Sequence, residues 1–376
     1  MIVSQPVIKG AANGKIRYTV NVDSENGVSS LWYEVDEPFG GFMSEQSDAA
    51  LVALLIPAMN TGEDIHFKGT VSKRLYFNLN DRLQHILQIV MPWLKRIEID
   101  CEGLTTAETS PGGVATGFSC GVDSYSVLAD YYYSDTVDGF KITHLFFNNV
   151  GSHGKGGEQL FNHRFEQIQK VTQKIGLPLI RVNSNLNEFY DDERLSFIQT
   201  FTLRNASVPY LLNKMIGRFY YASGLSYKGH RIRETYSASE SEAIIIPMLS
   251  AVGLDMVTVG SKYSRVEKTI QIAKIPDTYS TLDVCTSSEK LDKNCSKCIK
   301  CMRTMLTLDL AGKLDLYSEV FDIETFRKRK NGYIAHVLKG RNSLDNEIIQ
   351  YAKSINHAFP ASAHLKSVLK QMVGKD

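Results

Sequence analysis

The chain has 376 residues, of which 43% are hydrophobic and 22% are charged, and its formal net charge is +1. This composition is typical of a soluble globular protein with two domains or one large decorated domain. The near-zero net charge gives no overall attraction to nucleic acid or to an anionic membrane. The N-terminal segment lacks a signal-peptide pattern and the apolar runs are too short to span a bilayer, which predicts a cytoplasmic protein.

Residues 1–105 differ in pattern from the rest of the chain and are predicted to form an α+β accessory domain. Alternating stretches rich in β-branched and aromatic residues predict strands, and two apolar stretches predict helices. The predicted strands are 15–23, 29–35 and 65–72, and the predicted helices are 47–59 and 80–93. No residue here points to catalysis, so we expect this domain to shape a substrate site or to contact a protein partner.

Residues 112–312 contain short apolar strands that alternate with helical stretches. The predicted strands are 114–118, 142–147, 177–183, 219–223 and 256–260, and the first two helices between them are 124–132 and 159–175. This alternation predicts an α/β fold with a doubly wound, mostly parallel sheet, in which ligands bind beyond the carboxyl ends of the strands. Residues 313–376 have a polar, helical pattern that predicts a C-terminal helical extension.

The stretch GFSCGVDS directly follows the first predicted strand of this second domain. Its first five residues fit the nucleophile elbow of hydrolases, with Ser119 as the nucleophile. However, the late histidines lie in helical stretches, and the oxyanion motif that should precede the elbow is missing. Its last six residues fit a phosphate-binding loop that opens a helix, because free N–H groups and the positive end of the helix attract an anion. We favour the phosphate-loop interpretation.

In this interpretation the loop binds the phosphates of ATP. The residues that form it are Ser119, Cys120, Gly121, Val122, Asp123 and Ser124. The loop lacks the lysine of a Walker A motif, so Mg²⁺ is expected to supply positive charge, and Asp123 is expected to help hold it. Cys120 could act as a nucleophile, although a small residue that fills the loop is the interpretation we favour.

Four of the six cysteines lie close together near the end of the second domain. Cys285, Cys295, Cys298 and Cys301 have the spacing C-x9-C-x2-C-x2-C, which allows four thiolates to meet at one ion. Four closed ligands favour structural zinc, and a [4Fe–4S] cluster with similar ligands remains an alternative. A tight cysteine cluster in a long chain also favours a reducing compartment.

The phosphate loop resembles the S-G-G-x-D-S signature of the PP-loop ATP pyrophosphatases, with Cys120 in place of the second glycine. With the cysteine spacing added, residues 114–310 resemble the 7-cyano-7-deazaguanine synthase (QueC) family. Two further stretches are similar to motifs of that family: LRNAS, which contains Arg204 and Asn205, and SRVEKTIQIAK, which places Lys268 at the family's lysine.

The resemblance implies an enzyme that adenylates the carboxylate of a 7-deazaguanine with ATP and then lets ammonia attack, giving a nitrile in the end. It implies catalytic roles for Asp123, Arg204 and Lys268. It also implies substrate contacts for Arg204, Asn205 and Tyr236, although a solvated arginine or lysine and a packed tyrosine are the plainer alternatives. The implied cofactors are ATP, Mg²⁺ and structural Zn²⁺, and the implied assembly is a homodimer.

Two stretches depart from the family pattern. Residues 148–157 form a glycine-rich loop where the family has Y-G-Q-R-H, and residues 236–240, YSASE, replace Y-P-D-C-R. Three alternatives therefore stay open. The first is a QueC-like ligase that joins a deazaguanine to a protein amine, as in antiphage defence. The others are a tRNA-modifying PP-loop enzyme and a nucleotide sensor without turnover.

Overall fold

The structure, a computed structural model, describes residues 1–106, 110–154, 156–285 and 294–372. Its contacts divide the chain into two compact units. Unit 1 comprises Met1–Phe118, Asp135–Ser223 and His230–Val259, and unit 2 comprises Ser119–Ser134, Gly224–Gly229 and Gly260–Asp376. All the described strands belong to unit 1, whereas the described part of unit 2 consists of helices and loops.

Unit 1 contains both strands and helices. Its strands are β1 (Ile2–Val3), β2 (Val7–Ala11), β3 (Lys15–Ser24), β4 (Gly27–Asp36), β5 (Ile65–Ser72), β6 (Ile99–Thr105), β7 (Gly113–Gly117), β8 (His144–Asn149), β9 (Leu179–Ser184), β10 (Ile216–Ala222) and β11 (Asp255–Val259). Its helices are α1 (Glu37–Gly40), α2 (Asp48–Thr61), α3 (Lys73–Asn78), the π-helix η1 (Leu79–Leu83), α4 (Gln84–Val90), α6 (Glu158–Ile175), α7 (Phe197–Ala206) and α8 (Glu242–Met248), with the 3-10 helices η2 (Leu186–Tyr190), η3 (Pro209–Leu212) and η5 (Ala238–Glu240).

The strands form one mixed sheet in the order β11-β10-β7-β8-β9-β4-β3-β1-β5-β6, and β2 pairs with β3 beside this path. Strands β7 to β11 pair in parallel. Counted along the chain, these five strands stand in the order 5-4-1-2-3, so the order reverses between β7 and β10. The expected α/β fold with a mostly parallel sheet is confirmed. In sheets of this kind, ligands bind at such a reversal, beyond the carboxyl ends of the strands.

The antiparallel pair of β4 and β9 joins the N-terminal strands to the parallel strands. It places Tyr33 opposite Ser184 and Val35 opposite Val182. Residues 1–105, predicted as an accessory domain, therefore extend the same sheet and lie within unit 1. Residues 112–312, predicted as one domain, are divided between the two units, because Ser119–Ser134, Gly224–Gly229 and the chain from Gly260 onward belong to unit 2.

The core of unit 1 follows directly from the pattern of its side chains. Alternate residues of β3 and β4, such as Tyr18 and Tyr33, are buried. Every residue of α2 from Asp48 to Asn60 is buried, because this helix is apolar on nearly all sides. Each fully buried leucine or valine of this kind contributes roughly 1.5–3 kcal/mol to stability. The helix ends at Gly62, whose φ of +82° is the left-handed conformation of a C-terminal cap.

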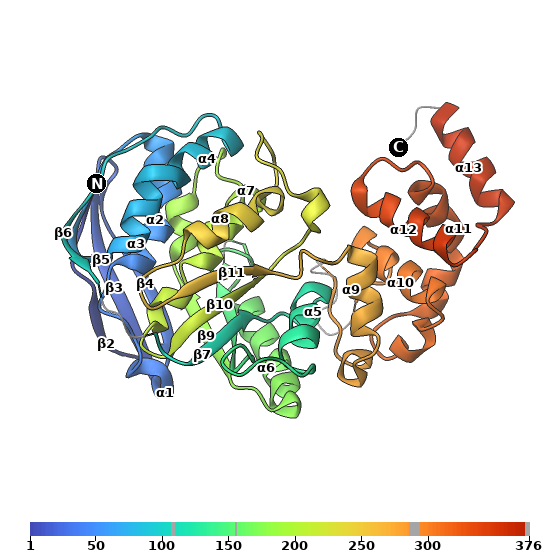
Figure 1. Ribbon diagram of the computed structural model, residues 1–376, viewed down its shortest axis with the longest axis horizontal. Coiled ribbons are helices and arrows are strands. Elements are labelled where there is room, and N and C mark those ends of the chain that lie inside the picture. The colour runs from blue at the N-terminus through green and yellow to red at the C-terminus, as the bar shows by residue number, and fades with distance from the viewer. Residues whose placement is uncertain (107–109, 155, 286–293, 373–376) are drawn as a thin grey trace. The chain divides into compact units, whose positions relative to one another are not determined.

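Helices cover both faces of the parallel strands (Figure 1). Helix α6 contacts β8 and β9, and it lies on the opposite side of the strands from α7 and α8. The handedness of the connections explains this arrangement. The connections from β8 to β9 and from β10 to β11 run in opposite directions across the sheet, and right-handed crossovers then place their helices on opposite faces.

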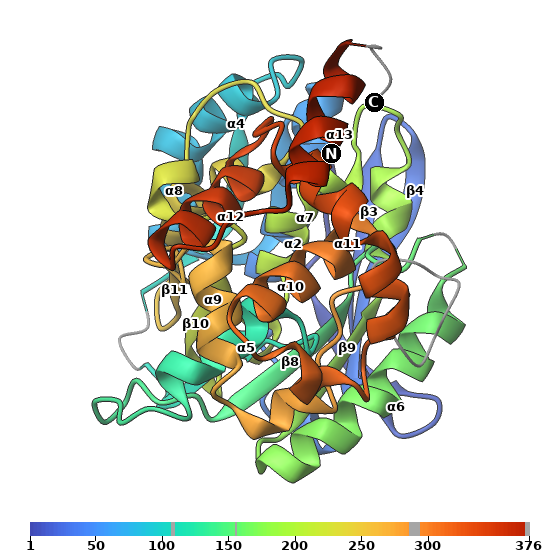
Figure 2. The ribbon, with the colours of Figure 1, turned by 90° about the vertical axis from the view of Figure 1, so that its right-hand side faces the viewer.

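Unit 2 is a group of packed helices, which Figure 2 shows most clearly. They are α5 (Val122–Tyr131), α9 (Arg265–Ile272), α10 (Ile299–Leu310), α11 (Ile323–Val337), α12 (Ser343–Ser354) and α13 (Ala361–Met372), with the 3-10 helices η4 (Tyr227–Gly229), η6 (Pro276–Tyr279) and η7 (Leu314–Tyr317). Helix α9 contacts α5, α10 and α12, and α11 contacts α10, α12 and α13. Within the described ranges, no helix is both long enough and apolar enough to cross a membrane.

Candidate functional site

The loop that joins β7 to α5 begins unit 2. Strand β7 ends at Gly117, and α5 starts at Val122 with Gly121 as its N-cap. Cys120 has a φ of +58° and is buried. This residue therefore adopts the left-handed backbone that glycine favours, which agrees with a loop pattern that normally has glycine there. Burial and the nearby Asp283 raise the pKa of the Cys120 thiol, so we assign it a packing role and no nucleophilic one.

The main-chain N–H groups of residues 119–124 have no hydrogen-bond partner within the described part of the chain. The loop is closed by the Ser124 hydroxyl, which donates to the Gly121 carbonyl at 3.0 Å. A β-carbon on Gly121 would lie 3.3 Å from the Ser119 hydroxyl, so the close turn favours glycine. Unpaired N–H groups at the start of a ten-residue helix form a site that attracts an anion.

Asp123, in the first turn of α5, forms two ion pairs with residues of α9. Its carboxylate oxygens lie 2.8 Å from the Arg265 guanidinium and 3.0 Å from the Lys268 ammonium. The Lys268 side chain is 1% exposed, so its charge has to be balanced by a close partner. Burial alone would raise the pKa of Asp123, but the charges of Arg265 and Lys268 outweigh burial and lower it. Asp123 is therefore a carboxylate already neutralised by two cations.

Helix α9 holds these two cations in place through its own N-terminus. Ser264 and Glu267 form a capping box, in which each side chain accepts a hydrogen bond from the main-chain N–H of the other residue. Gly260, beside Lys268, has a φ of +82°, the left-handed conformation that favours glycine. The sequence pattern predicted Lys268 but not Arg265. A basic residue directly after a serine N-cap was the available signal for it.

The four predicted metal ligands come together in unit 2. The sulfur atoms of Cys285, Cys295, Cys298 and Cys301 all lie within 4.8 Å of one another. The sulfurs of Cys298 and Cys301 are 3.4 Å apart, and those of Cys295 and Cys301 are 3.8 Å apart. Four thiolates at about 2.3 Å from one zinc ion lie about 3.8 Å apart, so the set fits a single tetrahedral ion. A [4Fe–4S] cluster fits less well, because each cysteine would bind a different iron.

The surroundings of these cysteines favour a thiolate at Cys295, whereas burial and the neighbouring Cys298 raise the pKa of Cys301. Main-chain N–H groups donate to sulfur: Cys295 to Cys285 at 3.4 Å, and Cys298 to Cys295 at 3.3 Å. Burial raises the pKa of Cys295, but N–H donors from Lys297 and Cys298 outweigh it and lower the pKa to about 7. A thiol that ionises near neutral pH is a ready ligand, and the cluster could hold a metal ion such as zinc.

No known protein family, curated protein or solved structure matches this chain. Its function therefore has to be argued from these residues and their geometry.

Arg204 lies in unit 1, on α7, and its side chain is enclosed by protein. The guanidinium donates to Thr200 and Asn187 at 2.9 Å and lies 3.8 Å from the centre of the Tyr190 ring. Burial lowers the pKa of Arg204 to about 10, against the opposing effect of Tyr190. In this conformation Arg204 ties the segment before α7 to the helix and offers no free face to a substrate.

The two other predicted substrate contacts also lie in unit 1. The Asn205 side chain donates to the Phe201 carbonyl at 2.9 Å, one turn earlier in α7. The Tyr236 ring is 81% exposed, so it is open to stacking but has no packed position. The structure therefore brings Lys268 to Asp123 of the phosphate loop. It also brings the four cysteines together. It does not gather Arg204, Asn205 and Tyr236 into one group.

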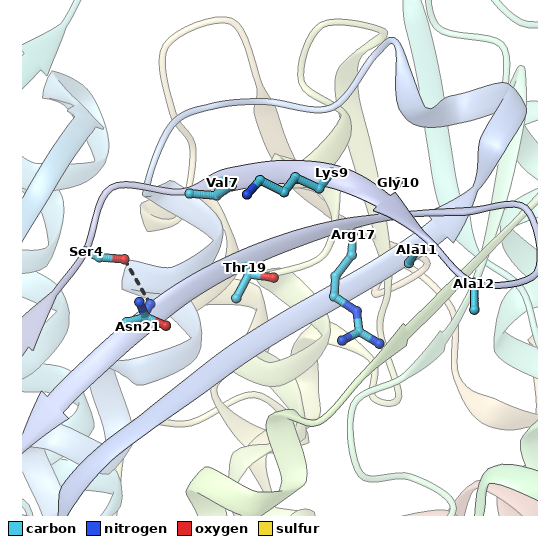
Figure 3. Close-up of a pocket in the computed structure, with 9 residues that line it drawn as sticks. All are labelled: Ser4, Val7, Lys9, Gly10, Ala11, Ala12, Arg17, Thr19 and Asn21. Atoms are coloured by element: carbon cyan, nitrogen blue, oxygen red, sulfur yellow. Dashed lines mark hydrogen bonds between the residues drawn. The ribbon is translucent and has the colours of Figure 1, made fainter.

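A pocket of about 460 Å³ lies on β2 and β3 (Figure 3). Ser4 lines it and accepts a hydrogen bond from the Asn21 N–H at 2.9 Å. Arg17, its most basic group, already pairs with Glu34 at 2.7 Å and lies over the Trp32 ring. None of the predicted site residues lines this pocket.

Proposed function

We propose that the protein adenylates a carboxylate with ATP, releases pyrophosphate, and then transfers the activated acyl group to an amine. The observation that carries this proposal is the combination, in unit 2, of a loop with unpaired N–H groups and the cations Arg265 and Lys268. The N–H groups suit phosphate oxygens, and the two cations supply the charge that a Walker lysine would provide. Asp123 holds both cations before a phosphate arrives, and charge preorganised in this way stabilises a departing pyrophosphate.

The substrate class comes from the resemblance to the QueC family, which suggests the carboxylate of a 7-deazaguanine and ammonia as the amine. A carboxylate is a poor electrophile at neutral pH, and adenylation converts one of its oxygens into a leaving group. Mg²⁺, when bound with ATP, would add positive charge at the phosphates. Asp123 could help to hold Mg²⁺, because each of its carboxylate oxygens accepts one cationic partner and keeps a second lone pair.

The test is to incubate the protein with Mg²⁺-ATP and 7-carboxy-7-deazaguanine, with and without ammonium, and to measure AMP and pyrophosphate. We expect AMP formation that depends on the deazaguanine. Lys268→Met should lower the rate by about 100-fold, the usual effect of removing one group that stabilises transition-state charge. Lys274→Met, in which an exposed lysine just after α9 is changed in the same way, should react like the wild type.

The products decide between the acceptors. A mass that corresponds to an amide or a nitrile would support ammonia, and AMP formation only with a peptide amine would support the protein-ligating alternative. Binding of ATP without AMP under any of these conditions would overturn the proposal in favour of a nucleotide sensor.

A second candidate, a tRNA-modifying PP-loop enzyme, is favoured by the charge of the C-terminal helices. Residues 323–372 contain nine lysines and arginines but only three acidic residues, although the whole chain has a net charge of +1. Arg327, Lys328 and Arg329 are exposed on α11. Such a basic surface suits a polyanion. AMP formation that requires transfer RNA and falls steeply as salt is raised would support this candidate over the first.

A further inference from the structure

The phosphate loop and the cysteine cluster both belong to unit 2, and one short segment, residues 282–285, contacts both of them. The Asp283 N–H of this segment donates to the Cys120 carbonyl at 2.9 Å. A β-carbon on Gly121 would lie 3.5 Å from the Asp283 carbonyl oxygen, so the segment packs against the loop at the N-cap of α5. The same segment ends at Cys285, the first of the four cysteines. A main-chain hydrogen bond therefore links the phosphate loop to a segment that ends in a predicted metal ligand.

Asn294 holds this segment from the other part of the cluster. It directly precedes Cys295 and is 4% exposed. Its side-chain oxygen accepts the Val284 N–H at 2.8 Å, and its side-chain nitrogen donates to the carbonyls of Leu282 at 2.8 Å and Val320 at 3.2 Å. Both ends of the amide are thus paired with main-chain groups, which fixes its orientation. Removing this side chain would leave buried main-chain groups without a partner.

The residues that hold the segment are next to two of the cysteines. The Cys285 N–H donates to the Asp283 carboxylate at 3.1 Å, and the Cys295 N–H donates to the Cys285 sulfur at 3.4 Å. Sulfur is a weak hydrogen-bond acceptor, whereas four thiolates bound to one ion are held strongly. An ion in the cluster should therefore fix Cys285 relative to Cys295 and, with them, the segment between the cluster and the loop.

We propose that Asn294 positions the phosphate loop, so that a metal ion held by the four cysteines strengthens ATP binding, an inference that rests on the proposed function. The loop needs such support, because Cys120 has a φ of +58°, which is costly for a residue with a β-carbon. The Asp283 N–H holds the carbonyl of this residue, and Asn294 holds the main chain on both sides of Asp283. Asn294 acts through this segment and not by contact with ATP, so it is a positioning residue.

The experiment measures the binding of Mg²⁺-ATP by isothermal titration, without a deazaguanine. Zinc-loaded protein is compared with protein whose zinc has been removed by a chelator that binds Mg²⁺ only weakly. We expect zinc removal to weaken ATP binding to the wild type by about 10-fold, within the usual range for coupled sites. Zinc-loaded Asn294→Ala should bind ATP as weakly as the zinc-free wild type, and zinc removal should then change its affinity by less than about 2-fold. A purely structural asparagine would leave the effect of zinc unchanged.

The matched control is Asn346→Ala. Asn346 is an exposed asparagine on α12 whose side chain donates to the Gly340 carbonyl at 3.3 Å, and its removal should leave the effect of zinc at the wild-type value. A second measurement needs no variant, because coupling between two binding sites is reciprocal. Saturating Mg²⁺-ATP should raise the zinc affinity of the wild type by the same factor of about 10, measured in competition with a coloured chelator.

The outcomes separate this inference from the proposed function. ATP affinity that does not depend on zinc in the wild type, or zinc affinity that does not depend on ATP, would overturn the inference and leave the proposed function in place. An effect of zinc on ATP binding that persists in Asn294→Ala, or loss of zinc from this variant by elemental analysis, would overturn the role of Asn294. No ATP binding to the wild type in either state would overturn the proposed function and, with it, this inference.

Discussion

Cys120 has a left-handed backbone conformation, which is unfavourable for a residue with a β-carbon. At a φ of +58°, a residue with a β-carbon is strained by about 1–2 kcal/mol. We predict that Cys120→Gly is more stable than Cys120→Ala by about 1 kcal/mol, because both lose the sulfur but only alanine keeps the β-carbon. Urea unfolding of the two variants measures the difference. An alanine variant as stable as the glycine variant would contradict the strained backbone.

Asp48 is a buried carboxylate at the start of α2 that no proposed reaction uses. One oxygen accepts the Ser72 N–H at 2.7 Å, while the other has no hydrogen-bond partner within the described residues. Burial raises the pKa of Asp48 to about 7, although the Ser72 N–H opposes this effect. The folded state thus holds its proton at a pH where the unfolded chain has already lost it. This contribution to stability is fully present below pH 3.8 and is lost as the pH rises through 7.

At pH 5, Asp48→Asn should therefore unfold at the same urea concentration as the wild type or at a lower one. At pH 8, Asp48→Asn should unfold at a clearly higher urea concentration than the wild type. The amide can still accept from Ser72, and it carries no charge to bury. Asp81→Asn, a change at an exposed carboxylate, should shift little between the two pH values. A wild type whose stability relative to Asp48→Asn does not change with pH would refute the raised pKa. Trp32 and Trp93 both belong to unit 1, so their fluorescence reports the unfolding of the unit that contains Asp48.

Helix α9 carries both cations of the candidate site, so the capping of its N-terminus should affect ATP binding. Ser264→Ala removes the serine half of the capping box and should destabilise unit 2 by about 1 kcal/mol, whereas Ser264→Asp, which keeps a cap acceptor, should cost little. Because Arg265 and Lys268 follow this cap, Ser264→Ala should also weaken ATP binding, as isothermal titration would measure. Equal ATP affinity in the alanine and aspartate variants would show that α9 is held by its packing and not by its cap.

Local patterns predicted individual elements well. Strands β3 and β5 and helices α2 and α6 were predicted to within two residues at each end. Strand β6 was missed because its charged residues and glycine interrupt the apolar alternation. The cysteine cluster could be predicted because its ligands are close in sequence. The β4–β9 pair could not, because its partners are far apart in the chain and only the folded sheet aligns them.

The same distinction applies to the site residues. Lys268 belongs to a short helical motif, and its contact with Asp123 joins two helices whose N-termini both carry polar signals. Arg204 sits in an equally recognisable motif, but its enclosure depends on Asn187 and Tyr190, which belong to the 3-10 helix η2 before α7. A sequence motif identifies a residue. Whether its charged group can reach a ligand depends on the segments that pack around it, which the motif does not include.

Over the whole molecule, the sheet and the predicted metal ligands belong to different compact units. If the cysteines hold zinc, the binding free energy stabilises the fold around α10, because Cys301 lies in the first turn of that helix. We predict one zinc per chain by elemental analysis, and none in Cys298→Ser. Cys101→Ser, a change at a cysteine of unit 1, should keep its zinc.

Removing the zinc with a chelator should therefore act on one unit. Peptides from α10 should lose protection from hydrogen exchange, while peptides from α2, which is buried within unit 1, should keep theirs. The same contrast should appear between Cys298→Ser and the wild type without any chelator. Equal loss of protection in α2 and α10 would mean that the two units unfold together. Unchanged protection in α10 would mean that the thiols pack without a metal, as the short sulfur-to-sulfur distances alone would permit.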